Sequence, residues 1–324
     1  MNEKAYIGHE QQIYGVEEHR LVGGKGDGMR LLEVRNGSGL SLTLSLDRCA
    51  DISRLSFKGD NFGYFAPCGY VAPAYYDPNG VGFLKSFTAG FLTTCGLRSV
   101  GSPCEDMGES LPLHGTVSHI PAEEVHYTVE NDAIHIYANI RDAALFAPCL
   151  LLERHYCIPL FSNEMYITDT VTNIGSVDTP LQMLYHFNVG YPLLDENTVL
   201  SIPAEQVTAR NAHAEEGIAD CLKMEKPQRG YEEMCYYHKM SGIAEVSVTN
   251  PKLGCGFTMS YDTAQLPYFT EWKMMGEGDY VLGVEPGNTL PDGRDVMRSR
   301  GKLEILKVGE SKQHHIQFTF REEK

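Results

Sequence analysis

The sequence has no run of about 18 apolar residues and no apolar segment near its first residue, so neither a membrane-spanning helix nor a secretory signal peptide is expected. Its nine cysteines are odd in number and widely spread and never form a C-x-x-C pair, which argues against a disulfide framework or a zinc ribbon. These absences predict a cytoplasmic protein with reduced thiols.

Basic residues are scarce, because 27 Lys and Arg stand against 43 Asp and Glu and give a formal net charge of −16. Such a surface repels phosphate backbones and anionic lipid headgroups, so neither nucleic acid nor a membrane is an expected partner. A phosphate-binding P-loop is also missing, and residues 23–28 (GGKGDG) are predicted to form a hairpin loop. No G-x-S-x-G elbow occurs, and no motif marks a cysteine as a nucleophile.

What the chain does contain is apolar and aromatic material, with 42% hydrophobic residues, 18 Tyr and 13 Phe in 324 residues. This is enough to bury a substantial core, and the length suits one large β domain or two ordinary domains. Because no internal repeat, low-complexity tract or linker interrupts the chain, one domain covering residues 1–324 is predicted.

Apolar residues alternate with polar ones at period two in many segments, which is typical of strands. In residues 133–140, for example, Ile134, Ile136 and Ile140 alternate with polar residues, and Asn131-Asp132 precede them as a predicted hairpin turn. The short, evenly spaced strands have no helical crossovers between them, so an all-β antiparallel sandwich is predicted. The predicted strands cover residues 29–34, 40–46, 53–58, 133–140, 150–158, 164–172, 181–187, 244–249, 256–261, 280–285, 302–308 and 315–320.

Two stretches, residues 66–118 and 204–237, are too long and irregular to be hairpin turns. Long segments of this kind inside a compact domain usually carry function, because a rigid sheet can hold them over a site.

Glu285 and His186 are the main candidates for chemistry. Glu285 ends an apolar strand just before Pro286, where partial desolvation would raise its basicity, although a structural ion pair is the alternative. His186 lies among apolar and aromatic neighbours, where a core histidine is the alternative. A carboxylate and an imidazole at opposite sides of a small polar molecule can act as general base and general acid.

Histidines also raise the question of a metal. The spacing of His114, His119 and His126 fits no common ligand motif, and His126 falls in a strand-like segment. A set of two histidines and one carboxylate, His114, His186 and Glu285, stays open as a geometric alternative.

Other residues fit a neutral carbohydrate ligand. Trp272 is the only tryptophan, and aromatic faces pack against the C–H faces of sugars, although core packing explains it as well. Arg48, in residues 47–52 (DRCADI), and Asp292, shortly after Glu285, could bond hydroxyl groups, and each also suits an ordinary charged turn.

Five segments carry a family resemblance. They are residues 47–52 (DRCADI), the predicted turn at 92–97 (LTTCGL), 113–115 (LHG), 185–192 (YHFNVGYP) and 282–286 (LGVEP). With these the chain resembles the aldose 1-epimerase-like proteins of the galactose mutarotase superfamily, in a divergent bacterial branch of unknown function. The resemblance implies a large twisted antiparallel β-sandwich of the supersandwich type, with a sugar site in a cleft across one sheet.

The resemblance also implies roles for residues. Glu285 would remove the proton of the anomeric hydroxyl, His186 would protonate the ring oxygen, and His114 would contact substrate hydroxyls. Arg98 stands where better-known mutarotases carry an Asn-Arg pair, and Asn188 belongs to the histidine segment, so both are expected to bind substrate with Arg48, Trp272 and Asp292. That segment is His-x-Tyr-Phe-Asn in the family and Tyr-His-Phe-Asn here. No cofactor is expected.

The sequence therefore predicts a sugar mutarotase with a small-molecule carbohydrate as its partner. Two alternatives stay open: a carbohydrate-binding protein without turnover, and another sugar isomerase, epimerase or lyase, with or without a divalent metal on His114, His186 and Glu285. An exposed sheet edge could also support a homodimer.

Overall fold

The computed structural model describes residues 3–322, and strands make up nearly all of its regular structure. The α-helices of this described part are α1 (Ala212–Glu216) and α2 (Arg294–Ser299). All pairings between the labelled strands of the described chain are antiparallel, so the predicted all-β antiparallel fold is confirmed. Within residues 3–322, no helix has both the length and the apolar character needed to cross a membrane.

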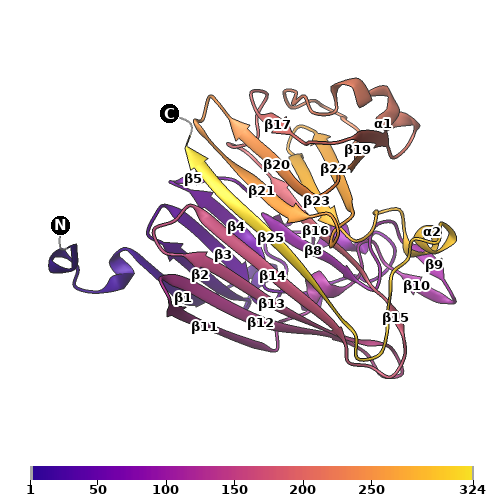
Figure 1. Cartoon of the computed structure of the whole chain (residues 1–324), viewed down its shortest axis with the longest axis horizontal. Helices are drawn as coiled ribbons and strands as arrows, with labels where there is room; N and C mark the ends of the chain where they lie inside the picture. Colours follow the sequence, from indigo (N-terminus) through magenta and orange to yellow (C-terminus); the bar gives the residue numbers. More distant parts are fainter. Residues whose placement is uncertain (1–2, 323–324) are drawn as a thin grey trace.

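Three sheets hold most of the strands (Figure 1). The five-stranded sheet has the order β1 (Tyr14–Arg20), β2 (Arg30–Asn36), β3 (Leu40–Ser45), β4 (Asp51–Phe57) and β5 (Asp60–Asn61). The eight-stranded sheet has the order β11 (Glu124–Glu130), β12 (Ala133–Ala143), β13 (Cys149–Pro159), β14 (Glu164–Asn173), β25 (Ser311–Glu322), β21 (Cys255–Asp262), β20 (Ile243–Asn250) and β17 (Val199–Ser201).

The six-stranded sheet carries the site described below. Its order is β18 (Gln206–Ala209), β19 (Met234–Lys239), β22 (Tyr268–Met275), β23 (Tyr280–Gly287), β16 (Gln182–Val189) and β8 (Leu92–Leu97). Three short pairs complete the described strands: β6 (Tyr64–Phe65) with β7 (Ala89–Gly90), β9 (Cys104–Asp106) with β10 (Glu109–Leu111), and β15 (Thr179–Pro180) with β24 (Ile305–Leu306).

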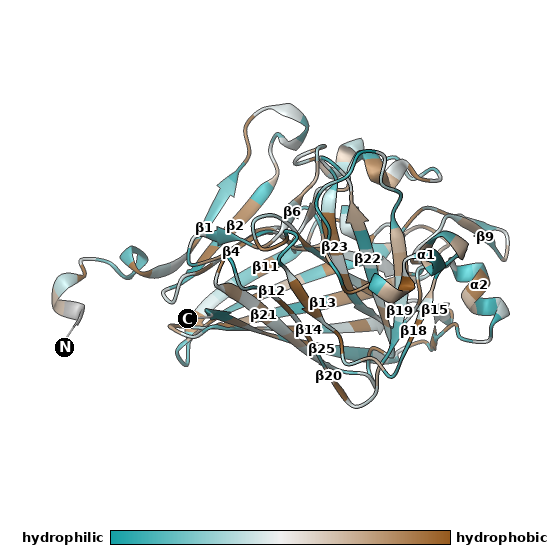
Figure 2. Cartoon of the chain, turned by 90° about the horizontal axis from the view of Figure 1, so that it is seen from above, coloured by the Kyte–Doolittle hydropathy of each residue, from teal (hydrophilic) through white to brown (hydrophobic). Residues whose placement is uncertain are grey.

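Period-two patterning explains the eight-stranded sheet. Along β14 every second residue is buried, and hydrophobic and hydrophilic residues alternate along β13 and β14 in Figure 2. The predicted turn between β11 and β12 is also confirmed, since Asn131 and Asp132 both have positive φ, 52° and 57°, as a two-residue type I′ hairpin requires. Residues 23–28 form the predicted hairpin loop between β1 and β2.

Aromatic side chains join the sheets in the core. Phe187 of β16 packs on Phe318 of β25 with ring centroids 4.9 Å apart, and Phe57 of β4 stacks on Phe320 of β25 at 5.8 Å. The six-stranded sheet and the five-stranded sheet therefore each pack one face against the eight-stranded sheet. This contact leaves the other face of the six-stranded sheet available for a site.

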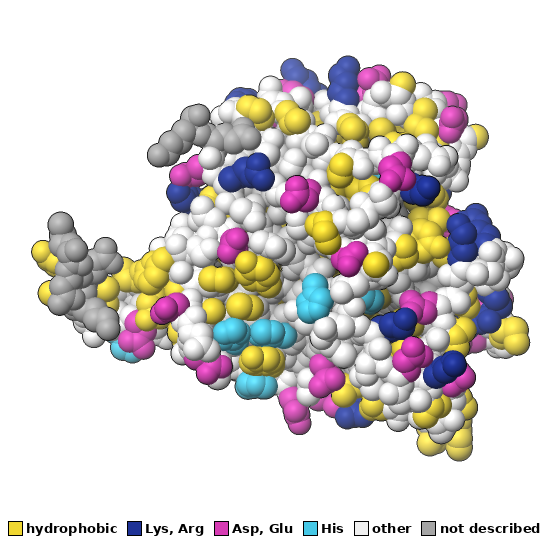
Figure 3. Space-filling view, in the orientation of Figure 1, with side chains coloured by type: hydrophobic (Ala, Val, Ile, Leu, Met, Phe, Trp, Pro, Cys, Tyr) yellow, Lys and Arg dark blue, Asp and Glu magenta, His cyan; other side chains and the backbone are white. Residues whose placement is uncertain are grey.

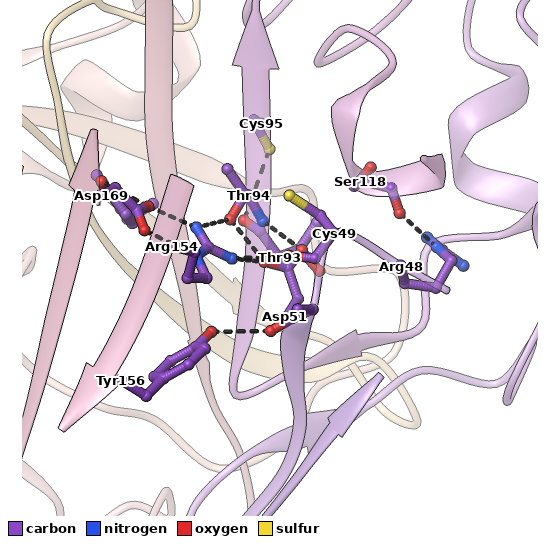
Figure 4. Close-up of polar contacts among 12 residues, drawn as sticks. Arg48, Cys49, Asp51, Thr93, Thr94, Cys95, Ser118, Arg154, Tyr156 and Asp169 are labelled. Carbon is purple, nitrogen blue, oxygen red and sulfur yellow. Dashed lines mark hydrogen bonds and ion pairs between the residues drawn. The ribbon is translucent and has the colours of Figure 1, made fainter. Parts of the chain in front are cut away.

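A buried ionic network crosses the same core (Figure 4). Arg154 of β13, with a fully buried side chain, contacts Asp169 of β14 at 2.7 Å and Asp51 of β4 at 2.6 Å. It also donates to Oγ1 of Thr94 in β8 at 2.8 Å, and the Tyr185 hydroxyl of β16 donates to Asp169 at 2.9 Å. Five strands from all three sheets are thereby fixed relative to one another.

Some predicted elements were wrong. The segment predicted as a turn, Leu92–Leu97, is the strand β8, whose six residues are all buried beside β16. In the predicted strand 302–308 only Ile305–Leu306 pairs. Strands β19 and β22 were not predicted, and in β22 the reason is that the charged residues Glu271 and Lys273 are buried, which breaks the apolar and polar alternation.

Candidate functional site

A cavity of about 310 Å³ opens on the outer face of the six-stranded sheet. This volume is at the low end of the range of about 300–1,000 Å³ that small-molecule sites occupy. Both long stretches singled out in the sequence contribute to its wall. It is lined by Val81, Phe83, Leu84, Phe87, Gly101, Ser102, Pro103, Leu113, His114, His186, Arg210, Glu233, Cys235, Thr270, Trp272, Glu285 and Pro291.

Glu285 and His186 meet at the floor of this cavity. They lie on the neighbouring antiparallel strands β23 and β16, and His186 Nε2 is 3.3 Å from Glu285 Oε1. This contact is not a hydrogen bond, and Glu285 Oε1 has no hydrogen-bond partner among the described residues. The other ring nitrogen, His186 Nδ1, also has none there. Both side chains are buried, so the floor of the cavity holds two polar atoms without a partner.

Burial shifts the protonation of this pair in opposite directions. It raises the pKa of Glu285 well above the ordinary value, with a further increase from Glu233 and a decrease from Arg210. It lowers the pKa of His186 well below the ordinary value, with a further decrease from His114. Both shifts favour the form of the pair in which Glu285 is protonated and His186 is neutral, so the pair carries one proton and no net charge.

Gly283 explains how the Glu285 carboxylate fits into the sheet. The carboxylate folds back over this glycine, and a Cβ built there would stand 2.2 Å from Glu285 Oε1 and 2.9 Å from Trp272 Cβ. The motif of residues 282–286 therefore contains a glycine because the acidic side chain occupies the space that a side chain at position 283 would need.

His114 reaches the cavity from a tight turn. Its φ of 57° lies in the left-handed region, and the turn is held by its backbone N–H, which donates to Gly101 O at 2.9 Å. Its ring centroid is 5.5 Å from that of His186 at an interplanar angle of 77°. Burial, followed by the charge of Arg210, lowers the pKa of His114 to about 4, so the imidazole is neutral near pH 7.

Aromatic side chains form one wall. Trp272 of β22 has its ring centroid 5.2 Å from that of His186 and 6.5 Å from that of Phe87. Its indole N–H donates to Glu233 Oε2 at 2.7 Å, which fixes the ring orientation. An apolar wall beside a buried acid–base pair suits a molecule with both C–H faces and hydroxyl groups.

The sequence did not indicate Arg210 or Glu233, yet both line the cavity. Arg210 donates to Ser102 Oγ at 2.8 Å and lies 3.8 Å from Asp292. Both residues come from the long stretch 204–237, which was expected to carry function. Their own neighbours in sequence show no motif, because the positions depend on how that stretch folds over β19 and β22.

The sequence matches one family over residues 26–320, the Domain of unknown function (DUF4432). The chain belongs to this family. No curated protein matches this chain.

Solved structures place this DUF4432 chain in a known fold. It is similar to a candidate aldose 1-epimerase from Klebsiella pneumoniae, with TM-score 0.90 and 25% identity over 97% of this chain and 86% of that one. It is also similar in fold to a galactose mutarotase-like protein from Clostridium acetobutylicum, with TM-score 0.69, 12% identity and coverage of 96% and 99%. It is also similar in fold to galactose 1-epimerase from Lactobacillus acidophilus, with TM-score 0.61, 12% identity and coverage of 96% of this chain and 100% of that one. The resemblance to the galactose mutarotase superfamily and its sandwich fold is confirmed.

Four predicted substrate-binding residues of the DUF4432 chain do not line the cavity. Arg48 is buried and donates to the backbone carbonyls of Ser118, Val71 and Ser86 (Figure 4 draws the contact with Ser118). Arg98 pairs with Glu109 at 2.6 Å.

The other two of these residues lie next to the cavity wall. Asn188 is buried and donates from Nδ2 to the His186 carbonyl at 2.8 Å, so it contacts the backbone of the candidate acid. Asp292 pairs with Arg300 at 2.6 Å and stands behind Arg210. Of the predicted set, the structure brings Glu285, His186, His114 and Trp272 together.

The histidines considered as metal ligands are distributed over three places. His114 lines the cavity, and His119 is buried with its Nε2 3.0 Å from an Arg48 nitrogen. His126 stacks on Tyr137 at 4.6 Å on the exposed face of the eight-stranded sheet, where Figure 3 shows histidines grouped. Among the described residues, His114, His186 and Glu285 do not form a set whose ligand atoms all lie within 4.8 Å of one another.

Proposed function

We propose that this protein is an aldose 1-epimerase, which interconverts the α and β anomers of a free sugar. The observation that supports the proposal most directly is the buried Glu285–His186 pair, 3.3 Å apart at the floor of an aromatic cavity. The fold similarity to a candidate aldose 1-epimerase from Klebsiella pneumoniae supports the same reaction class.

The reaction needs one proton removed and one delivered at neighbouring atoms. In a cyclic sugar the anomeric hydroxyl oxygen and the ring oxygen are bonded to the same carbon, so an acid and a base that lie side by side can serve both. Burial favours the proton on Glu285 in the resting site, so the proposed step starts from the less populated form in which His186 carries it. In that form Glu285 is a carboxylate and can take the hydroxyl proton. The bond between C1 and the ring oxygen then breaks, and that oxygen receives the proton from His186.

The open-chain aldehyde then rotates about its C1–C2 bond, and the ring closes on the other face of the carbonyl with the two proton transfers reversed. No net charge enters the buried site during the cycle, because the pair only passes one proton between its members. This matters because burial penalises an uncompensated charge. His114, as a neutral imidazole, would bond a substrate hydroxyl, and Trp272 would pack on a C–H face of the sugar.

Exchange NMR of anomeric protons over a panel of free aldoses, deoxysugars and ketosugars tests the proposal. We expect wild type to accelerate anomer exchange for at least one sugar, and Glu285→Gln to lower the rate by about 10²–10⁴ while binding persists. Glu277→Gln, at an exposed position on the surface, is the matched control and should retain the wild-type rate.

Two results would contradict the proposal. Binding without faster exchange would favour a carbohydrate-binding protein. Chemical conversion of a panel sugar to something other than its anomer would favour another sugar isomerase, epimerase or lyase that uses the same cavity.

A further inference from the structure

The face of the six-stranded sheet that is turned away from the cavity carries a second polar group, which the proposed reaction does not use. Cys221, His238 and Glu271 are all buried, and one ligand atom from each lies within 4.8 Å of the others. His238 belongs to β19 and Glu271 to β22, whereas Cys221 comes from the segment that follows α1. No other such group occurs within residues 3–322.

The register of the strands shows that this group is separate from the cavity. Cys235 is paired with Trp272 across β19 and β22, and both of these side chains line the cavity. Tyr236 is paired with Glu271 in the next position, so Glu271 points to the opposite face. His238, two residues after Tyr236, shares that face.

Two polar atoms of the group lack partners. His238 Nε2 is 2.8 Å from Glu271 Oε2, but Glu271 Oε1 and His238 Nδ1 have no hydrogen-bond partner in the described chain. His238 is 3% exposed and Glu271 is 0% exposed. A buried carboxylate oxygen without a partner costs free energy, so the protein gains if a ligand occupies this place.

Lys273 holds the cysteine segment in position beside the group. Its ammonium donates to the carbonyl of Asp220 at 3.1 Å and to the carbonyl of Lys223 at 2.6 Å, on either side of Cys221. A thiol, an imidazole and a carboxyl group therefore converge at one buried point.

We propose that Cys221, His238 and Glu271 form a structural binding site for one divalent cation of the zinc class. Thiolate, imidazole and carboxylate are the ligands that zinc selects, with bonds of about 2.3, 2.0–2.1 and 2.0–2.2 Å respectively. The cation replaces the hydrogen bond between His238 and Glu271, and the thiol proton of Cys221 leaves to solvent as the metal–sulfur bond forms. The two anionic ligands compensate the charge of the dication, and Glu271 Oε1 or water completes the coordination.

Such a site would fasten the segment after α1 to β19 and β22. The opposite faces of these strands carry Cys235, Thr270 and Trp272 in the cavity wall. The cation would thus stiffen the wall without contacting a substrate, and the inference does not depend on the proposed reaction.

Cobalt titration of the full chain, after removal of metals with a chelator, tests this site because Co²⁺ replaces zinc and reports thiolate ligation by its charge-transfer absorption. We expect one Co²⁺ per wild-type chain, with that absorption, and displacement by Zn²⁺. Cys221→Ser should remove the absorption and weaken binding at least about tenfold. Cys235→Ser is the matched control, because Cys235 is buried on the same strand as His238 but faces the cavity, and it should keep both properties.

The wild-type titration is decisive even where a variant fails to fold. A wild-type chain that binds no stoichiometric Co²⁺, or binds it without the thiolate absorption, overturns the proposal. Absorption that survives Cys221→Ser and disappears in Cys235→Ser also overturns it, since the metal would then lie in the cavity. Glu271→Gln keeps the side-chain shape. This variant should bind Co²⁺ more weakly than wild type but should retain the thiolate absorption.

Discussion

His186 Nε2 lies 3.3 Å from Glu285 Oε1, between adjacent strands of one sheet. The sequence analysis considered an acid and a base at opposite sides of a small molecule, whereas the structure sets the two side by side. This arrangement suits ring opening of a hemiacetal, in which both reacting oxygens are attached to a single carbon. It also makes the two groups one titrating unit, so their protonation is best described for the pair.

The pH dependence of the proposed reaction should follow the single proton of this pair. We expect activity at every pH where the pair holds one proton. Activity should fall at alkaline pH, when this last proton leaves the pair. Glu233 raises the pKa of Glu285 and Arg210 lowers it. Glu233→Gln should therefore move the alkaline limb of kcat/KM to lower pH, and Arg210→Gln should move it to higher pH.

These opposite shifts distinguish electrostatic effects from lost contacts. Both residues line the cavity, so both variants could also raise KM at every pH, but only a change in the charge near Glu285 moves the midpoint of the limb. Midpoints that stay fixed, or move in the same direction, would contradict the assignment.

Gly283→Ala should lower kcat by about 10–100-fold while substrate affinity changes little. The new Cβ would stand 2.2 Å from the present position of Glu285 Oε1, so the carboxylate must move by an amount that misaligns it with the reacting hydroxyl. Steady-state kinetics and ligand titration measure the two effects.

A double-mutant cycle then shows whether the loss acts through Glu285. In a Glu285→Gln background, Gly283→Ala should cost little further activity, because the group it displaces is already inactive. A full additional loss would mean that the glycine acts on some other part of the site.

Glu285→Gln should stabilise the fold at pH 8 and not at pH 4. Burial raises the folded-state pKa of Glu285 above its ordinary value of 4.5. The wild-type carboxyl group therefore contributes its full stability to the fold below pH 4.5, and the fold loses this contribution as pH rises toward the folded-state pKa. The amide carries no charge at either pH. Urea unfolding at both pH values measures the difference, and Glu277→Gln should show none.

Arg154→Met should reduce the free energy of unfolding by about 3–5 kcal/mol. The substitution leaves Asp51 and Asp169 buried without their shared cation, at a point where five strands meet. The exposed Arg229, paired with Glu277 at 2.7 Å, provides the control, and Arg229→Met should leave the urea midpoint unchanged. Equal midpoints for both variants would show that the network contributes no net stability.

The sequence by itself determined the strand content and the reaction class that we propose. Period-two alternation at Ile134, Ile136 and Ile140 requires a strand with one buried and one exposed face. The pattern sets which side chains are buried independently of the strand that pairs with it. Glu285 and His186 were identified because an ionisable residue in an apolar strand is conspicuous, and because the surrounding motifs resemble the mutarotase superfamily.

Only the tertiary structure decided which residues share the cavity. Arg210 and Glu233 enter it from an irregular segment, while Arg48 and Arg98 turn away to backbone carbonyls and to Glu109. The sequence analysis identified neither strand β22 nor the group of Cys221, His238 and Glu271, and the reason is the same for both. Polar side chains buried on a strand oppose the local pattern, and their partners come from positions distant in sequence that folding alone brings together.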